Sequence, residues 1–201
     1  MTWQLCDETD WGFGWLQEER LARCSHALRA EGRVWLFDPV DLPGIEERIR
    51  ALGEPAGVIQ LLDRHRRDCA ALAERLGVPL HVTPFDGIRG APFDPVPILR
   101  HRFWREVALW WPEERALLCG DALGTVGYFV ASGELLGVHP LLRLTPPKAL
   151  SRFAPRHVLC GHGEGVHGDG AAPALAEALA TARRRLLRAW RYGWRQAKGG
   201  R

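Results

Sequence analysis

Several residues that can bind a divalent metal ion follow short apolar runs of the chain. Residues 57–62, 116–119 and 157–160 have the length and composition of buried strands. Behind them come His65, Asp68 and Cys69, then Asp121, and then His162. Carboxylate, thiolate and imidazole groups are the ligands that zinc takes in proteins. No two of the five cysteines are spaced as in a zinc knuckle or a redox pair, so only the fold could bring such ligands together.

The pattern of apolar and turn residues predicts strands and helices in alternation. Two strands are expected over residues 25–37 around a turn at 30–32, and further strands at 57–62, 79–82, 104–111, 116–119 and 157–160. Helices are expected at 45–52, 68–76, around 147–153 and from about 173 to 194. This order predicts an α/β fold in which helices cover packed sheets, and we expect a single domain over residues 1–201.

Taken in order, the polar segments resemble those of the metallo-β-lactamase superfamily. The family's His-x-His-x-Asp-His motif lies between a buried strand and a helix, and it aligns with residues 64–69, Arg-His-Arg-Arg-Asp-Cys. The segment 116–123 resembles the one whose aspartate bridges two metals, which is Asp121 here. The segment 157–165 resembles the strand that ends in Gly-His-Gly, whose histidine is His162 here. The resemblance covers roughly residues 24–165 and implies an αββα sandwich.

The same resemblance implies that one of the family's two metal sites is lost. In the family, the first metal is bound by the first two motif histidines and by a later histidine. The alignment puts Arg64, Arg66 and Arg102 at these positions. A guanidinium group keeps its proton in proteins and offers no lone pair to a metal. Hydrolysis by two zinc ions is therefore not expected.

The family's second metal site keeps side chains that can bind zinc. Its positions hold Asp68, Cys69, Asp121 and His162. The expected cofactor is therefore either none or one zinc ion. With four protein ligands, such a zinc site would be of the closed, structural type.

The three arginines have a physical role if no metal binds. Without a cation, the carboxylates of Asp68 and Asp121 would lie close together in a cleft, which is unfavourable. Guanidinium groups at positions 64, 66 and 102 would neutralise them, with at least one within about 2.7–3.2 Å of a carboxylate. The same arginines would attract a small anionic ligand.

A shifted register is a further alternative. His65 and His101 neighbour the lost ligand positions and would then be ligands themselves. His167, just after the segment GHGEG, also lies close to the expected site.

Composition and charge limit the other functions. A hydrophobic fraction of 46% and a charged fraction of 25% are typical of a globular protein. The net charge of +3 does not indicate a nucleic-acid partner, and the basic residues from position 183 onward suit the negative end of a helix dipole. No apolar run reaches the roughly 20 residues that span a bilayer. The scattered cysteines favour a cytoplasmic protein. The nine tryptophans suit core packing or a homodimer contact.

Two function classes remain after the sequence analysis. In the first, the chain is a diverged member of the fold that no longer hydrolyses substrates and acts by binding. In the second, it is a hydrolase that uses a single metal, which requires an open coordination position. A closed set of four ligands favours the first class.

Overall fold

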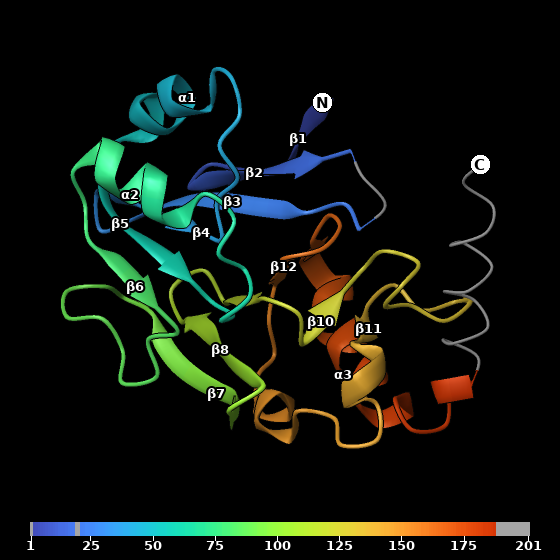
Figure 1. Cartoon of the computed structure of the whole chain (residues 1–201). Helices are drawn as coiled ribbons and strands as arrows, with labels where there is room; N and C mark the ends of the chain where they lie inside the picture. The colour runs from blue at the N-terminus through green and yellow to red at the C-terminus, as the bar shows by residue number, and fades with distance from the viewer. Residues whose placement is uncertain (1, 19–20, 188–201) are drawn as a thin grey trace.

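Two β-sheets pack face to face in the computed structural model, which describes residues 2–18 and 21–187 (Figure 1). The first sheet has the strand order β1-β2-β3-β4-β5-β6, and the second has the order β13-β12-β9-β8-β7. The first contains β1 (Trp3–Thr9), β2 (Gly12–Gln17), β3 (Cys24–Ala30), β4 (Arg33–Phe37), β5 (Glu54–Gln60) and β6 (Leu80–Val82). The second contains β7 (Asp94–His101), β8 (Trp104–Trp111), β9 (Ala116–Cys119), β12 (His157–Cys160) and β13 (Val166–His167).

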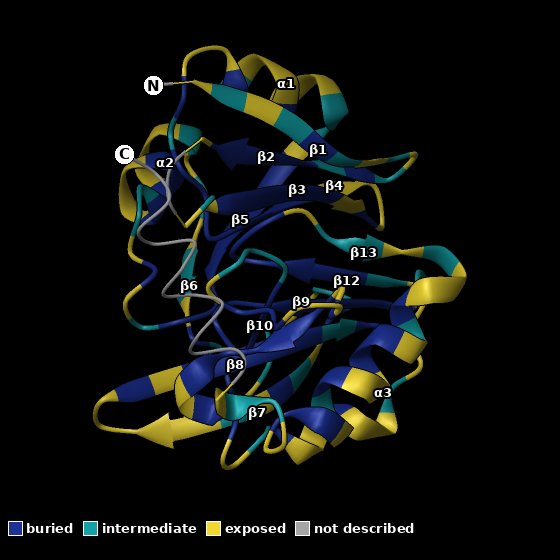
Figure 2. Ribbon diagram, turned by 90° about the vertical axis from the view of Figure 1, so that its right-hand side faces the viewer, coloured by how far each residue is buried: buried dark blue, intermediate teal, exposed yellow. Residues whose placement is uncertain are grey.

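Helices cover the outer faces of both sheets (Figure 2). They are α1 (Ile45–Leu52), α2 (Cys69–Leu76) and α3 (Ala171–Thr181). Short 3-10 helices η1 (Pro140–Leu142), η2 (Lys148–Arg152) and η3 (Gly168–Gly170), with the small ribbon β10 (Leu123–Gly124) and β11 (Gly137–Val138), complete the described elements.

Three apolar clusters correspond to the three interfaces between these layers. Between the sheets, Phe37 and Ile59 of the first pack with Leu109 of the second. On one outer face, Ile49 of α1 packs in a cluster with strand residues of the first sheet. On the other, Leu175 of α3 packs in a cluster with residues of β9 and β12. The expected αββα sandwich is therefore the fold that the structure has.

The sequence prediction missed the hairpin β1–β2, strand β7 and the two-residue strands β10, β11 and β13. The hairpin β1–β2 was not predicted because a β-bulge between Cys6 and Thr9 breaks the period-two alternation of apolar residues. Strand β7 was not predicted because its sequence contains Pro95 and Pro97. Proline is tolerated there because β7 is the last strand of its sheet.

Within the described residues, turns interrupt the predicted C-terminal helix of about 173–194, and residues 186–187 are helical again. Helix α3 ends at Thr181, and residues 182–185 form turns. There Arg183 Nε donates to the Leu144 carbonyl at 2.8 Å, and Arg185 pairs with the Glu177 carboxylate at 2.7 Å. The rest of the predicted basic helix, from residue 188 onward, lies outside the described residues. Among the described helices, none is both long and apolar enough to cross a membrane.

Candidate metal centre

Three loops that follow parallel strands meet at one edge of the sandwich. Strand β5 is parallel to its neighbours β4 and β6, and β9 is parallel to β12. The carboxyl ends of β5, β9 and β12 lead into the loops that carry His65, Asp121 and His162. Loops at the carboxyl ends of parallel strands are where such folds commonly place ligands.

The side chains of these three residues converge on one point. Asp121 Oδ1 lies 3.0 Å from His65 Nε2 and 3.2 Å from His162 Nε2, and the two Nε2 atoms are 3.3 Å apart. All three side chains are largely buried, with exposed fractions of 8% for His65, 13% for Asp121 and 9% for His162. Two imidazole nitrogens and a carboxylate oxygen at such spacing are suited to a divalent metal ion.

In each imidazole ring, the hydrogen bond at Nδ1 determines that the lone pair at Nε2 points to the centre. His65 Nδ1 lies 2.8 Å from the carboxylate of Asp38, and His162 Nδ1 lies 2.8 Å from the carbonyl oxygen of Leu21. Both partners are acceptors, so each Nδ1 carries the proton. In the neutral rings each Nε2 therefore presents a lone pair to the centre.

Asp121 supplies a test of whether these residues fit a metal. Its Oδ1 is buried and receives no hydrogen bond among the described residues, although it faces both imidazoles. Burial raises the pKa of Asp121, but the two histidines outweigh burial and hold that pKa well below its usual range. Because Asp38 and Asp121 outweigh burial and Arg67, the pKa of His65 is raised. Either a proton or a metal ion can bind between these three side chains. A metal ion would use one lone pair from each of them.

Glycine and glutamate let the loops approach one another. A Cβ atom on Gly161 would lie 2.9 Å from His65 Cε1 and 2.8 Å from the Gly120 carbonyl oxygen, so a side chain there would displace the imidazole.

The fully buried Glu106 accepts hydrogen bonds from the backbone N–H of Ala122 at 2.7 Å and from Trp104 Nε1 at 2.8 Å. Burial, with Asp121 nearby, raises the pKa of Glu106 to about 7. These contacts fix the turn that carries Asp121.

Of the four predicted ligands, the structure brings together Asp121 and His162 but not Asp68 and Cys69. Helix α2 begins at Cys69, with Asp68 as its N-cap residue. Asp68 Oδ2 accepts from the backbone N–H of Asp41 at 2.8 Å, and Cys69 is buried in the cluster between the first sheet and its helices. The third member of the observed cluster is His65, which was named with His101 as an alternative ligand in a shifted register. The cluster that could hold a metal ion therefore has three members, His65, Asp121 and His162.

The arginines at the lost ligand positions do not form the predicted short pairs. Arg64 Nε lies 3.7 Å from Asp121 Oδ2, longer than a hydrogen bond, and its guanidinium stacks on the Trp104 ring at 4.1 Å. Arg102 stacks on Phe103 at 4.0 Å. Arg66 is exposed, and no ion pair from it to either carboxylate occurs in the described part of the chain.

The residue that bridges the loops is Arg67, which the sequence analysis did not single out. Its Nη1 donates to the carbonyl oxygens of Cys24 and Asp38 at 2.6 and 2.8 Å, and its Nη2 donates to that of Gly161 at 2.7 Å. One guanidinium thus joins both sheets beside His162. Its position in an arginine-rich run gave no signal that distinguishes it from its neighbours.

The two other histidines named from the sequence lie apart from the centre. His101 is exposed and packs against Phe103. His167 Nε2 lies 2.8 Å from Asp7 Oδ1, in a different cluster. A histidine that the sequence analysis did not favour, His139, lies close by: it packs edge-on against Trp104 and Phe129, and burial lowers its pKa to about 4. Phe129 in turn stacks on the His162 ring at 5.6 Å.

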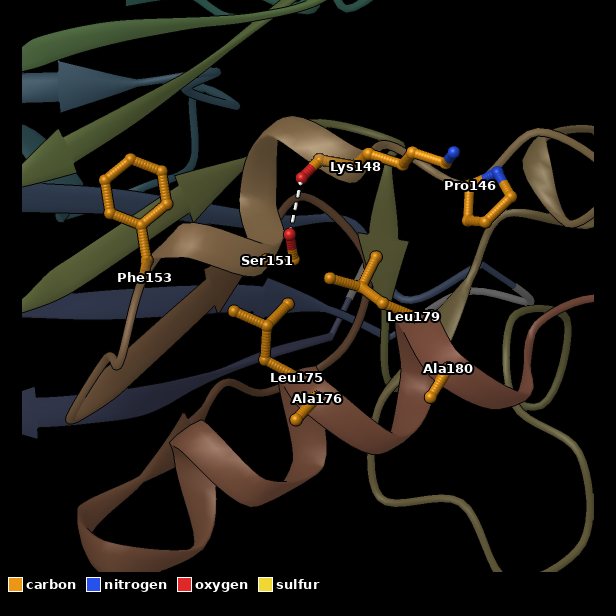
Figure 3. Close-up of a pocket in the computed structure, with 8 residues that line it drawn as sticks. All are labelled: Pro146, Lys148, Ser151, Phe153, Leu175, Ala176, Leu179 and Ala180. Atoms are coloured by element: carbon orange, nitrogen blue, oxygen red, sulfur yellow. Dashed lines mark hydrogen bonds between the residues drawn. The ribbon is translucent and has the colours of Figure 1, made fainter.

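A separate apolar pocket of about 330 Å³ lies between η2 and α3 (Figure 3). Leu175 and Leu179 of the helix face Phe153 and Pro146 across it, and Ser151 Oγ donates to the Lys148 carbonyl at 2.8 Å. None of the three converging residues lines this pocket, so it is not part of the candidate metal centre.

Comparison with solved structures supports the fold. No family model matches the sequence, and no curated protein matches it. Among solved structures, the chain is similar to the DIM-1 metallo-β-lactamase exposed to ceftazidime, with a TM-score of 0.60 and 13% identity over 90% of this chain and 98% of that one. It is also similar to the FIM-1 metallo-β-lactamase from Pseudomonas aeruginosa in its mono-zinc form, with a TM-score of 0.59 and 11% identity over 91% and 97%.

A third solved structure is also similar to this chain. It is TTHA1623 in a di-iron-bound form, with a TM-score of 0.55 and 22% identity over 80% of this chain and 94% of that one. At such identities the likeness establishes the fold. With its two covered sheets and its histidine–aspartate cluster at the sheet edge, the chain has the metallo-β-lactamase fold.

Proposed function

We propose that the chain binds one divalent metal ion through His65, Asp121 and His162 and uses it as a single-metal hydrolase. The observation that carries the proposal is the convergence of three ligand atoms, 3.0–3.3 Å apart, whose imidazole tautomers are fixed by Asp38 and Leu21. Three protein ligands leave a coordination position open, which is the arrangement of catalytic rather than structural zinc sites. This favours the hydrolase over the binding role that four ligands would suggest.

The bound metal would supply Lewis-acid polarisation of water or of a substrate oxygen. The protein's own residues orient the ligands. Asp38 holds His65, the Leu21 carbonyl holds His162, and Glu106 fixes the turn of Asp121. Zinc is the favoured ion, and a two-histidine, one-carboxylate set also suits ferrous iron. The mono-zinc form of FIM-1 and the di-iron form of TTHA1623 support each metal as a candidate.

An anionic substrate is supported by the residues beside the centre. The Arg64 side chain is 45% exposed, lies 3.7 Å from Asp121, and is oriented by the Trp104 ring. Tyr128 is half-exposed and packs edge-on against His139. Burial and Asp121 raise the pKa of the Tyr128 hydroxyl, so it stays protonated and can donate a hydrogen bond. A guanidinium and a phenol beside a metal suit a carboxylate or phosphate group of a substrate.

The experiment uses chelator-stripped protein, reloaded with one equivalent of zinc, on chromogenic esters, thioesters, phosphodiesters and β-lactams. We expect turnover of at least one class to require the metal and to fall by at least about 100-fold in His162→Ala. Arg64→Ala should raise KM for an anionic substrate more than for its neutral analogue, with kcat little changed. Stoichiometric metal binding without turnover of any class beyond that of His162→Ala would instead support the binding role.

A further inference from the structure

A second group of metal-binding side chains lies inside the first sheet, away from the candidate metal centre. Cys6 Sγ and Cys24 Sγ are 3.3 Å apart, Cys24 Sγ lies 3.6 Å from His26 Nε2 and 3.8 Å from Asp7 Oδ2, and His26 Nε2 lies 2.9 Å from Asp7 Oδ2. The four side chains are buried: Cys6 is 7% exposed and Cys24 1%, and the side chains of Asp7 and His26 are 2% and 5% exposed.

Strand pairing explains how residues 6 and 26 meet. Cys6 on β1 is paired with Gly14 on β2, and Gly14 is paired with His26 on β3. Cys24 is two residues before His26 and therefore on the same face of β3. A Cβ atom on Gly14 would lie 2.9 Å from Cys6 Sγ and 3.0 Å from His26 Cδ2. The glycine thus leaves the space in which side chains from β1 and β3 converge across the middle strand.

The β-bulge brings the carboxylate into this space. Asp7 follows Cys6 in the bulge and has a φ of 51°. In a regular strand the side chains of neighbouring residues point to opposite faces of the sheet, but this irregular backbone puts the Asp7 side chain on the same face as that of Cys6. Asp7 Oδ1 accepts from the backbone N–H of Gly165 at 2.7 Å and pairs with His167 Nε2 at 2.8 Å. The second oxygen, Oδ2, is left facing the two thiols. Hydrogen bonds to the outer atom of a ligand are typical of built metal sites.

The two thiols and the carboxylate are close enough together to hold one zinc ion. Zn–S bonds of about 2.3 Å and Zn–O bonds of about 2.0 Å place neighbouring ligand atoms roughly 3.3–3.8 Å apart. The two thiols are 3.3 Å apart, Cys24 Sγ lies 3.8 Å from Asp7 Oδ2, and the ligand atoms of Cys6, Asp7 and Cys24 all lie within 4.8 Å of one another. His26 Nε2, 2.9 Å from Asp7 Oδ2, holds this carboxylate in place. Two thiolates select zinc over the hard cations magnesium and calcium.

A disulfide explains the cluster less well. Cys6 and Cys24 are on β1 and β3, with β2 between them. Their sulfur atoms are 3.3 Å apart and both cysteines are free thiols, whereas an S–S bond is about 2.05 Å long. A cation between Cys6, Asp7 and Cys24 would use the carboxylate together with both thiols, which a disulfide would not.

We propose that Cys6, Asp7 and Cys24, with His26 holding the Asp7 carboxylate, form a zinc site that is independent of the candidate metal centre. The site would fasten the edge hairpin β1–β2 to β3. Through Asp7 and Gly165, it would also fasten that hairpin to the loop that carries His162. The proposal does not depend on hydrolase activity or on metal binding at His65, Asp121 and His162.

The test is a titration of the metal-stripped, reduced full chain with Co²⁺ and then with Zn²⁺. Cobalt bound by thiolates gives a near-ultraviolet charge-transfer band, which a site of histidine and aspartate alone does not give. We expect the band in the wild type and in Asp121→Asn, its loss in Cys6→Ser and Cys24→Ser, and its displacement by Zn²⁺. Zinc should also raise the Tm of Asp121→Asn, since an ion bound only by the folded state stabilises it.

Cys69→Ser is the matched control because Cys69 is buried but belongs to neither cluster. It should retain the full band. Cobalt binding without the band in the wild type, or loss of the band in Cys69→Ser, would overturn the proposal. So would a thiol count that shows Cys6 joined to Cys24 in the presence of mild reductant. Should the serine variants not fold, His26→Asn replaces them, with an expected loss of zinc affinity of at least about tenfold; unchanged affinity there would also contradict the site.

Discussion

Truncation of Arg67 to alanine is expected to lower the free energy of unfolding by about 3–5 kcal/mol. Each hydrogen bond from a charged group contributes about 1.5–3 kcal/mol, and the sum over three bonds is reduced because Arg67 is only partly buried. The guanidinium donates to three backbone carbonyls, one each from Cys24, Asp38 and Gly161. Its loss would leave these acceptors, which belong to both sheets, without their charged donor. Denaturant unfolding of the metal-free proteins at equal ionic strength measures the difference.

Neighbouring arginines are the controls for this prediction. Arg66→Ala is expected to be near neutral because that side chain is exposed. Arg64→Ala should cost about 0–1 kcal/mol, because its pair with Asp121 is long and its side chain is 45% exposed. Arg67→Lys should recover only part of the loss, since an ammonium group cannot span three acceptors as a planar fork does. A loss in Arg64→Ala as large as in Arg67→Ala would contradict this account and support the charge-replacement hypothesis.

Replacement of Asp121 by asparagine is expected to weaken zinc binding at the candidate metal centre by more than about 100-fold. Loss of an outer-shell partner alone costs about 10–100-fold in affinity, and Asp121 Oδ1 contacts both imidazoles directly. Competition with a chromophoric chelator measures the affinity. A Cys6→Ser background leaves one site to titrate.

Asp68→Asn provides the matched comparison, because it makes the same change at the other aspartate of the predicted ligand set. Asp68 accepts from the backbone N–H of Asp41 and does not reach the centre. Its variant should therefore keep the wild-type affinity for zinc. A comparable loss in both variants would restore Asp68 to the ligand set and close the open position on which the proposed hydrolysis depends.

The sequence was sufficient to predict the fold because the chain keeps the periodic apolar patterns of its strands and helices and the order of its motifs. The helices at 45–52 and 69–76 and the strands at 104–111, 116–119 and 157–160 lie where apolar spacing predicts them. Asp121 and His162 each follow a buried strand directly, so the register of the strand determines where their side chains lie. The prediction was weakest where the backbone departs from regular geometry, at the bulge after Cys6 and in the proline-containing strand β7.

The remaining site residues depend on contacts that no local pattern encodes. Which member of Arg64-His65-Arg66-Arg67 faces the centre is determined by a single turn, where Arg67 adopts a φ of 40°. His65 is selected because Asp38, 27 positions earlier, binds its Nδ1. Cys6 and Cys24 meet only because Gly14, on the strand between them, has no side chain. Pairings across such separations require the strand register, which one sequence does not supply.

Anomalous diffraction at the zinc edge, from crystals grown with zinc, tests the central claim most directly. The account predicts one peak at the sheet edge, about 2.0–2.2 Å from His65 Nε2, Asp121 Oδ1 and His162 Nε2. It also predicts no second peak within about 4 Å, the usual separation in two-metal sites. Two peaks about 3.5–4 Å apart would contradict the single-metal centre, and a lone peak bonded to Asp68 and Cys69 would contradict the ligand set itself.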